Sequence, residues 1–149
     1  MPIRLLSYTR PKLNSVEFFQ LVVVAMWRRF QRDMVADDLC CAAIVLLDQM
    51  IDWIAIDTGE KPKFVRQRLV RAEENFSSLN LAARAIKHRE LDRGPHKGLR
   101  DILSSGGKVM EDGSVKVPIV FLPGKQSLKV DVLLETCIKA VADELQLSV

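Results

Sequence analysis

Apolar residues recur with helical spacing along most of the chain and predict a bundle of about five helices. Capping residues, glycines and prolines stand between the periodic stretches and set their expected bounds. The helices are expected at about 14–34, 36–56, from 62 through 76, from 77 or 78 to before 94, and 129–147. A predominantly α-helical bundle is therefore the predicted fold class.

Polar residues at two helix starts are of the types that cap helices. Asn14 followed by Glu17 resembles a capping box, although Ser15 is an alternative cap for the same helix. Ser77 or Ser78 is expected to cap the fourth helix by accepting a hydrogen bond from the backbone of its first turn. These residues predict where the first and fourth helices begin.

The second helix is apolar around most of its circumference. Its polar residues fall on one arc of about 120° at the helical repeat of about 100° per residue. They are Asp38, Asp48, Gln49 and Asp52. A helix with so narrow a polar strip is expected to be the central helix of the bundle.

Regular apolar spacing also predicts which side chains of the other helices are buried. The third helix is expected to start at Pro62 or Lys63, because proline is tolerated at the first helical position. Its expected buried seam is Val65, Leu69, Ala72 and Phe76. The last helix is expected to bury Val132, Leu133, Cys137, Val141 and Leu145.

The segment around 107–122 changes from helical spacing to a pattern typical of a β-hairpin. Asp112-Gly113 at its centre is a strong turn signal, with strands expected at about 107–111 and 114–122. Pro118 indicates an edge or bulged second strand. Because an isolated hairpin is marginally stable, it is expected to pack on the helices, beside an edge strand or tail at 2–9.

Composition is consistent with one globular domain over residues 1–149. The chain is 48% hydrophobic and 28% charged, and its three cysteines form no metal-binding or disulfide pattern. We expect buried free thiols and neither a metal nor a cofactor. The N-terminus lacks the apolar run of a signal peptide, and the uncharged stretches 18–27 and 39–47 are too short to span a bilayer. A cytoplasmic protein with no membrane contact is the expectation.

Charge is strongly segregated along the chain. Residues 35–57 carry five Asp and no Lys or Arg, whereas residues 58–100 carry eleven Lys or Arg and five acids. The Asp residues are expected to face basic residues of neighbouring helices, and the basic excess that remains is of the sign that attracts a polyanion.

The predicted fourth helix carries a polar stripe that is the nearest approach to a chemical site. Asn80, Arg84, Lys87 and His88 share an arc roughly 100° wide. One interpretation is catalytic: His88 moves a proton, while Arg84 and Lys87 hold a phosphate and Asn80 orients either partner. The other interpretation is structural, with the stripe solvated or paired with the Asp residues of the second helix.

The Asp strip of the second helix also has two interpretations. Asp48 and Asp52 lie one turn apart and, with Asp38, have oxygens of the type that bind a divalent cation. The helix has no Glu or His for a dinuclear carboxylate site, so ion pairs are favoured over a metal. The expected partners are Arg28, Arg32, Arg84 and Lys87.

Several short features follow one another in an order that matches a known family. Asp52-Trp53 lies near the end of a long second helix, Lys87-His88 ends a later helix, and a hairpin and a final helix follow. This order resembles the HEPN (higher eukaryotes and prokaryotes nucleotide-binding) bundles and uncharacterised helical-bundle proteins of bacteria. The resemblance implies an RNase or nucleotide-binding protein, often dimeric, that uses Arg84 and His88. These two residues are closer in sequence than the Arg and His of the family's nucleases.

Two functional hypotheses follow. The first is a non-enzymatic module that binds a partner or a small ligand, or assembles with itself, as a homodimer for example. It rests on the lack of a complete catalytic set. The second is a HEPN-like RNase or nucleotide-binding protein in which Arg84 and His88 are catalytic and Asn80 and Lys87 bind phosphate, with RNA or a nucleotide as its partner.

Overall fold

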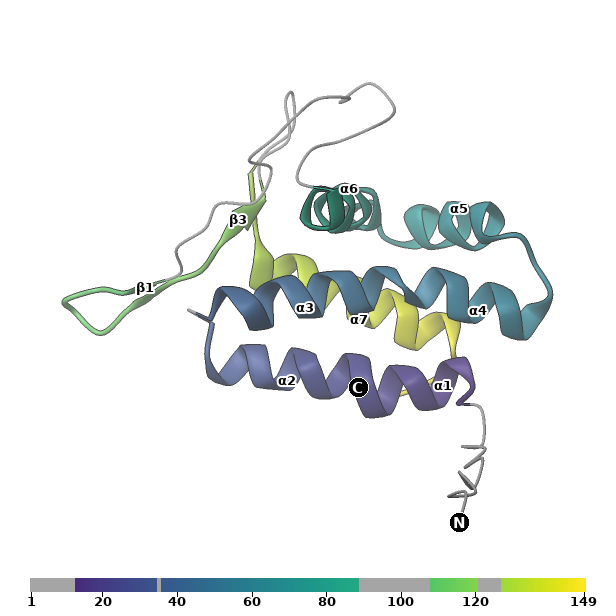
Figure 1. Cartoon of the computed structure of the whole chain (residues 1–149), viewed down its shortest axis with the longest axis horizontal. Coiled ribbons are helices and arrows are strands. Elements are labelled where there is room, and N and C mark those ends of the chain that lie inside the picture. The colour runs from purple at the N-terminus through teal and green to yellow at the C-terminus, as the bar shows by residue number, and fades with distance from the viewer. Residues whose placement is uncertain (1–12, 35, 89–107, 121–126) are drawn as a thin grey trace, which may run out of the picture.

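The protein is a mainly helical bundle with small antiparallel strand pairs, as its sequence predicts. The computed structural model describes residues 13–34, 36–88, 108–120 and 127–149. Figure 1 shows two long helical rods lying side by side, a layer of two shorter helices across them, and the C-terminal helix behind. The predicted 2–9 segment lies outside the described residues.

The first rod consists of α1 (Ser15–Phe18), a π-helical turn (Phe19–Val23) and α2 (Val24–Arg32). The predicted capping box is confirmed: Asn14 Oδ1 accepts a hydrogen bond from Glu17 N at 2.8 Å, and Glu17 accepts one from Asn14 N at 3.4 Å. The rod ends at Arg32, two residues before the predicted end.

The π-helical turn within the first rod was not predicted. It joins two adjacent buried pairs, Phe18-Phe19 and Val23-Val24, which are spaced by five residues. A π-helix bonds residues i and i+5, so this spacing brings both pairs to one side of the rod. The Phe18 ring stacks on Trp53 of the second rod at 4.1 Å between centroids.

The second rod consists of α3 (Asp37–Asp48) and α4 (Met50–Thr58), interrupted only at Gln49. Gly59, at φ +72°, ends it in the left-handed conformation that glycine adopts without strain. Figure 1 shows the rod between α1–α2 and the layer of α5 (Pro62–Ala72) and α6 (Asn75–His88), with α7 (Val130–Glu144) behind it. It is therefore the central helix that its narrow polar strip predicts.

The Asp37–Thr58 rod is also long and apolar enough to cross a bilayer by length and composition alone. Half of its most apolar window, with a mean hydropathy of 1.9, is buried inside the protein. The central helix of a bundle has the same properties, and here α2, α6 and α7 contact it.

Helices α5 (Pro62–Ala72) and α6 (Asn75–His88) form the layer across the rods. Val65 and Leu69 are buried as predicted, but Ala72 is exposed. The predicted seam fails there because α5 ends at Ala72. Phe76, the last residue of the predicted seam, is buried, but it belongs to α6 and not to α5.

The start of α6 also differs from the prediction. The helix begins at Asn75, so Ser77 and Ser78 lie inside its first turn and are not its caps. Ser77 Oγ donates to the Glu74 carbonyl oxygen at 2.9 Å, and Ser78 is buried. Both serines thus form part of the helix whose start they were expected to mark.

The last helix, α7 (Val130–Glu144), buries Leu133, Cys137 and Val141 as predicted, and Leu145 beyond its end is partly buried. Val132 is the error, because its side chain is 40% exposed. It lies on the solvent face with Glu135 and Lys139, three and seven residues further along the helix.

The three cysteines are free thiols. Cys40 and Cys137 are buried and Cys41 is half-buried. Burial, with smaller contributions from the charges of Cys41 and Asp37, raises the pKa of Cys40 to about 12. Burial is also the main cause that raises the pKa of Cys137. The thiolate is the reactive form of cysteine, and a raised pKa disfavours it. Both side chains are therefore best described as unreactive members of the core.

The predicted hairpin is present but shorter. Strand β1 (Lys108–Val109) pairs antiparallel with β2 (Val115–Lys116) across the Asp112-Gly113 turn. The expected second strand is divided, because β3 (Ile119–Val120) pairs with β4 (Leu128–Lys129), directly before α7. The division falls at Pro118, which has no N–H to donate to a partner strand.

The core can be tested at adjacent positions of α7. Leu133 is fully buried, so Leu133→Ala should lower the free energy of unfolding by about 2–5 kcal/mol. Val132→Ala, at an exposed neighbour, should change it by less than about 0.5 kcal/mol. Urea denaturation followed by circular dichroism measures both variants, and equal losses would contradict the burial pattern of α7.

Candidate functional site

The polar stripe of α6 faces the end of α3. Asn80 Nδ2 donates a hydrogen bond to Asp48 Oδ1 at 3.0 Å, and Lys87 Nζ lies 3.8 Å from Asp48 Oδ2. Asp48 is only 9% exposed. One buried carboxylate thus engages two of the four stripe residues, with a separate partner for each oxygen.

The electrostatics of Asp48 are a balance between burial and these partners. Burial raises the pKa of the carboxyl group, and the hydrogen bond from Asn80 is the largest opposing cause. Lys87 and Arg66 also lower the pKa, and Asp52 raises it. The net result is a pKa above the ordinary value for Asp, so ionised Asp48 is less stable here than in water.

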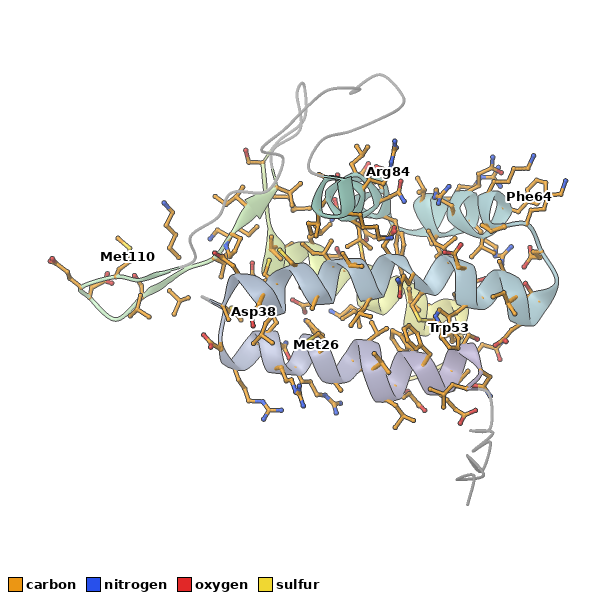
Figure 2. All side chains as sticks on the ribbon, viewed as in Figure 1. Met26, Asp38, Trp53, Phe64, Arg84 and Met110 are labelled. Carbon is orange, nitrogen blue, oxygen red and sulfur yellow. The ribbon has the colours of Figure 1, made fainter. Side chains whose placement is uncertain are left out.

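Arg84 and His88 lie on the same helix as Asn80 and Lys87. Arg84 is half-buried one turn after Asn80 and is labelled on α6 in Figure 2. His88 is the last described residue of α6, one turn further along. The backbone therefore places both residues in sequence along one helix, as predicted.

The three acidic candidates do not form one cluster, because only Asp52 lies close enough to Asp48 for its charge to affect it. Asp38 is exposed in the first turn of α3, about 15 Å along the helix from Asp48 at about 1.5 Å per residue. Asp52 is exposed on α4. Within the described ranges, His, Cys, Asp and Glu form no group of three suited to a metal ion.

Two of the expected cationic partners lie apart from the acidic strip. Arg28 and Arg32 are exposed on α2. Among the described side chains, neither forms an ion pair with Asp38, Asp48 or Asp52. Lys87 is the expected cation that pairs with Asp48.

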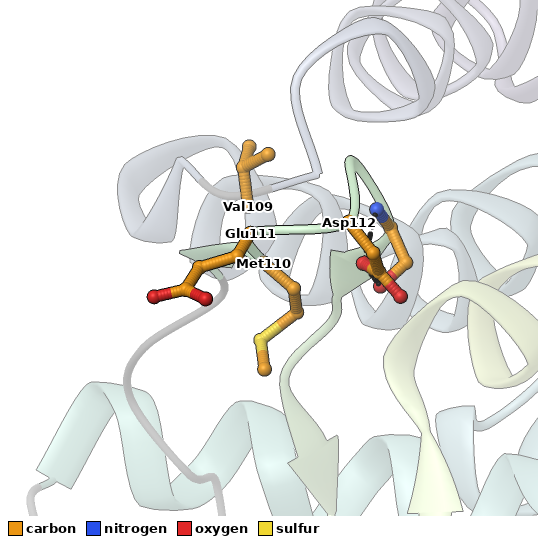
Figure 3. A pocket seen from close by; sticks show the side chains of 5 residues that line it. Val109, Met110, Glu111 and Asp112 are labelled. Atoms are coloured by element: carbon orange, nitrogen blue, oxygen red, sulfur yellow. Dashed lines mark hydrogen bonds between the residues drawn. The ribbon is translucent and has the colours of Figure 1, made fainter.

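A second candidate site is the β1–β2 hairpin, which projects beyond the end of α3 (Figure 1). Val109, Met110 and Val115 are 63%, 42% and 50% exposed, although large apolar side chains usually lie in the core. An open hollow of about 420 Å³ is lined by Val109, Met110, Glu111, Asp112 and Ser114. Figure 3 shows Val109 and Met110 pointing to opposite sides of the hairpin.

Within the described part of the chain, the backbone of the hairpin has two open outer edges. Met110 N donates to the Ser114 carbonyl oxygen at 2.8 Å, and Val109 lies opposite Val115 in the register. Hydrogen-bonded and non-hydrogen-bonded pairs alternate in antiparallel strands, so Val109 and Val115 point their N–H and C=O groups outward. No other strand of the described residues pairs with either edge.

The tip of the hairpin is acidic and is closed by its own hydrogen bonds. Gly113 N donates to Met110 O at 3.0 Å, and Gly113 has φ +83°, which closes a turn over Glu111 and Asp112. Asp112 Oδ1 accepts hydrogen bonds from Ser114 Oγ at 2.6 Å and Ser114 N at 2.9 Å. These bonds lower the pKa of Asp112 and keep its carboxylate ionised.

Sequence patterns identified the hairpin but not its exposed apolar side chains. Their signal is the symmetry of the segment, in which Val109 and Val115 are equally spaced from the turn at Asp112. That symmetry places the two valines on one face of paired strands.

No family model, curated protein or solved structure matches the chain.

Removal of the Asn80 amide should show how far Asp48 depends on it. Asn80→Ala leaves a buried carboxylate oxygen without its donor, so the free energy of unfolding should fall by about 1–3 kcal/mol. Lys87→Ala removes a longer and more exposed contact and should cost about 0–1 kcal/mol. Chemical denaturation at neutral pH measures both, and a larger loss for Lys87→Ala would contradict the assignment.

Asp48→Asn should have a higher free energy of unfolding than the wild-type protein, and the difference should grow as pH rises. The folded-state pKa of Asp48 is raised, so its contribution to stability is present below the unfolded pKa and is lost as pH rises through the folded value. The variant has no such loss from about pH 4 upward. Denaturation at several pH values measures the difference. Asp38→Asn, on the exposed first turn of α3, is the control, and a difference that shrinks with rising pH would contradict the prediction.

Proposed function

We propose that the protein is a non-enzymatic helical scaffold that binds a polypeptide partner through the β1–β2 hairpin. The observation that carries the proposal is the exposed Val109–Val115 pair on a hairpin with open edges. An added strand would take its backbone hydrogen bonds from one edge and its apolar contacts from the valines. The bundle would hold the hairpin clear of the helices.

The contacts of α6 favour this function over catalysis by the polar stripe. Asn80 and Lys87, which the catalytic hypothesis assigns to phosphate binding, are engaged by Asp48. A buried carboxylate needs such partners, because burial without them is costly. The alternative drawn from the HEPN resemblance assigns RNA cleavage to Arg84 and His88, and it would have to operate without the two residues that Asp48 holds.

A photo-crosslinking amino acid at position 115 tests the proposal in living cells. Val115→p-benzoylphenylalanine should give a discrete polypeptide adduct on illumination, because the side chain lies at the binding edge. The matched control is the same substitution at Val132, an exposed valine on the bundle at 40% exposure compared with 50% for Val115. Gel mobility and mass spectrometry identify the adducts.

Three crosslinking outcomes would contradict the proposed function. They are the absence of an adduct at position 115, equal adducts at positions 115 and 132, and crosslinking to RNA. Cleavage of RNA by the purified protein would also contradict it if His88→Ala abolished the activity without lowering thermal stability. That result would favour the HEPN-like alternative.

A further inference from the structure

The β2 edge is complementary to a second copy of itself. Val115 directs its N–H and C=O groups away from β1, so they are oriented toward an incoming strand. The hairpin also carries opposite charges at its two ends. Glu111 and Asp112 lie at the tip, and exposed Lys116 lies toward the base.

We propose that β2 pairs antiparallel with β2 of a second copy of this chain, about a two-fold axis at Val115. The proposal rests on the proposed function and names its partner. Two hairpins then form one four-stranded sheet in the order β1, β2, β2, β1. The contact is isologous, so it closes after two copies.

The axis position follows from the side-chain alternation of strands. Opposed residues in an antiparallel pair place their side chains on the same face. A two-fold axis normal to the sheet must therefore pass midway between one residue and its own copy. Each hairpin already has Lys108 opposite Lys116. An axis at Lys116 would place two such lysine pairs side by side, which adds to the like-charge repulsion. An axis at Val115 instead brings together two residues whose backbone N–H and C=O groups point outward, so a pair of N–H···O=C bonds joins them.

The charges of the hairpin favour the same register. With the axis at Val115, Lys116 lies opposite Ser114 of the second copy. Ser114 is the first residue after the turn formed by Glu111, Asp112 and Gly113, so the lysine lies near the acidic tip of that copy. The hydrogen bonds from Ser114 hold Asp112 in place at the tip.

Apolar burial adds to the charge complementarity. Val109 and Val115 lie opposite each other on one face of each hairpin, so the joined sheet carries four valines in a row across its strands. Val109 and Val115 are now 63% and 50% exposed, and formation of the row would lower these exposed fractions. A contact between two short strands lies below the ~1,200 Å² of stable interfaces, so we expect reversible, concentration-dependent association.

Cysteine crosslinking with a matched pair of variants tests this arrangement in the purified full-length chain. In the paired sheet the two copies of residue 115 are adjacent, about 5.5 Å apart at Cα and within the reach of a disulfide. The two copies of residue 109 are three strand spacings apart, about 14 Å, which a disulfide cannot span. Mild oxidation should therefore crosslink Val115→Cys several-fold faster than Val109→Cys, with the unmodified chain giving the background from Cys41.

A charge variant provides a second test. Lys116→Glu in the Val115→Cys background should slow crosslinking several-fold at low salt, because it places like charges beside the acidic tip of the second copy. High salt should reduce the difference between these two proteins. Circular dichroism is the control for folding of each variant.

Several results would overturn the pairing of β2 with itself. Faster crosslinking of Val109→Cys would assign the contact to β1, and equal rates for Val109→Cys and Val115→Cys would indicate collisions. Acceleration by Lys116→Glu would refute the register. No crosslinking in either cysteine variant, together with a heterologous adduct at position 115 in cells, would overturn self-pairing while leaving the proposed function standing. The absence of both would overturn both.

Discussion

The structure depends on covering the second rod, which is apolar on nearly every side. Ile44, Leu47, Met50 and Ile51 share one face of the rod and are each at most 1% exposed, and Leu39, Leu46 and Trp53 on the adjacent face are partly buried. A helix of this kind needs neighbours around most of its circumference, because each buried aliphatic side chain contributes about 1.5–3 kcal/mol. Helices α2, α6 and α7 supply those neighbours.

That requirement also determines the role of the polar stripe. Covering α3 with α6 places the Asp48 carboxylate in the seam between them, where water no longer solvates it. The helix that removes the water must then supply the hydrogen-bond donors, and Asn80 and Lys87 do so from α6. One buried charge on α3 therefore accounts for the contacts of Asn80 and Lys87, two of the four residues on the polar face of α6.

Local signals explain which features could be predicted from the sequence. The Asn14 cap and the Asp112-Gly113 turn depend on neighbouring residues alone, and both are present. The expected cap at Ser77 or Ser78 is wrong because α6 already begins at Asn75. Burial depends on partners distant in sequence, so periodicity extended the α5 seam past the helix end and placed Val132 in the core. The pairing of Asp48 with Asn80 was open for the same reason, because periodicity aligns residues along a helix without fixing how two helices are rotated against each other.

Asp48 is a charged group that the fold removes from water, whereas the hairpin leaves apolar groups in contact with water. An open edge with exposed valines is a hazard in general, because any extended chain can add to it. Here the strands are only two residues long, the tip carries Glu111 and Asp112, and Pro118 ends β2. These features limit the number of backbone bonds an added strand can form and repel acidic chains at the tip. An edge limited in this way favours a reversible contact with one complementary strand over open-ended aggregation, which is the property that a binding module requires.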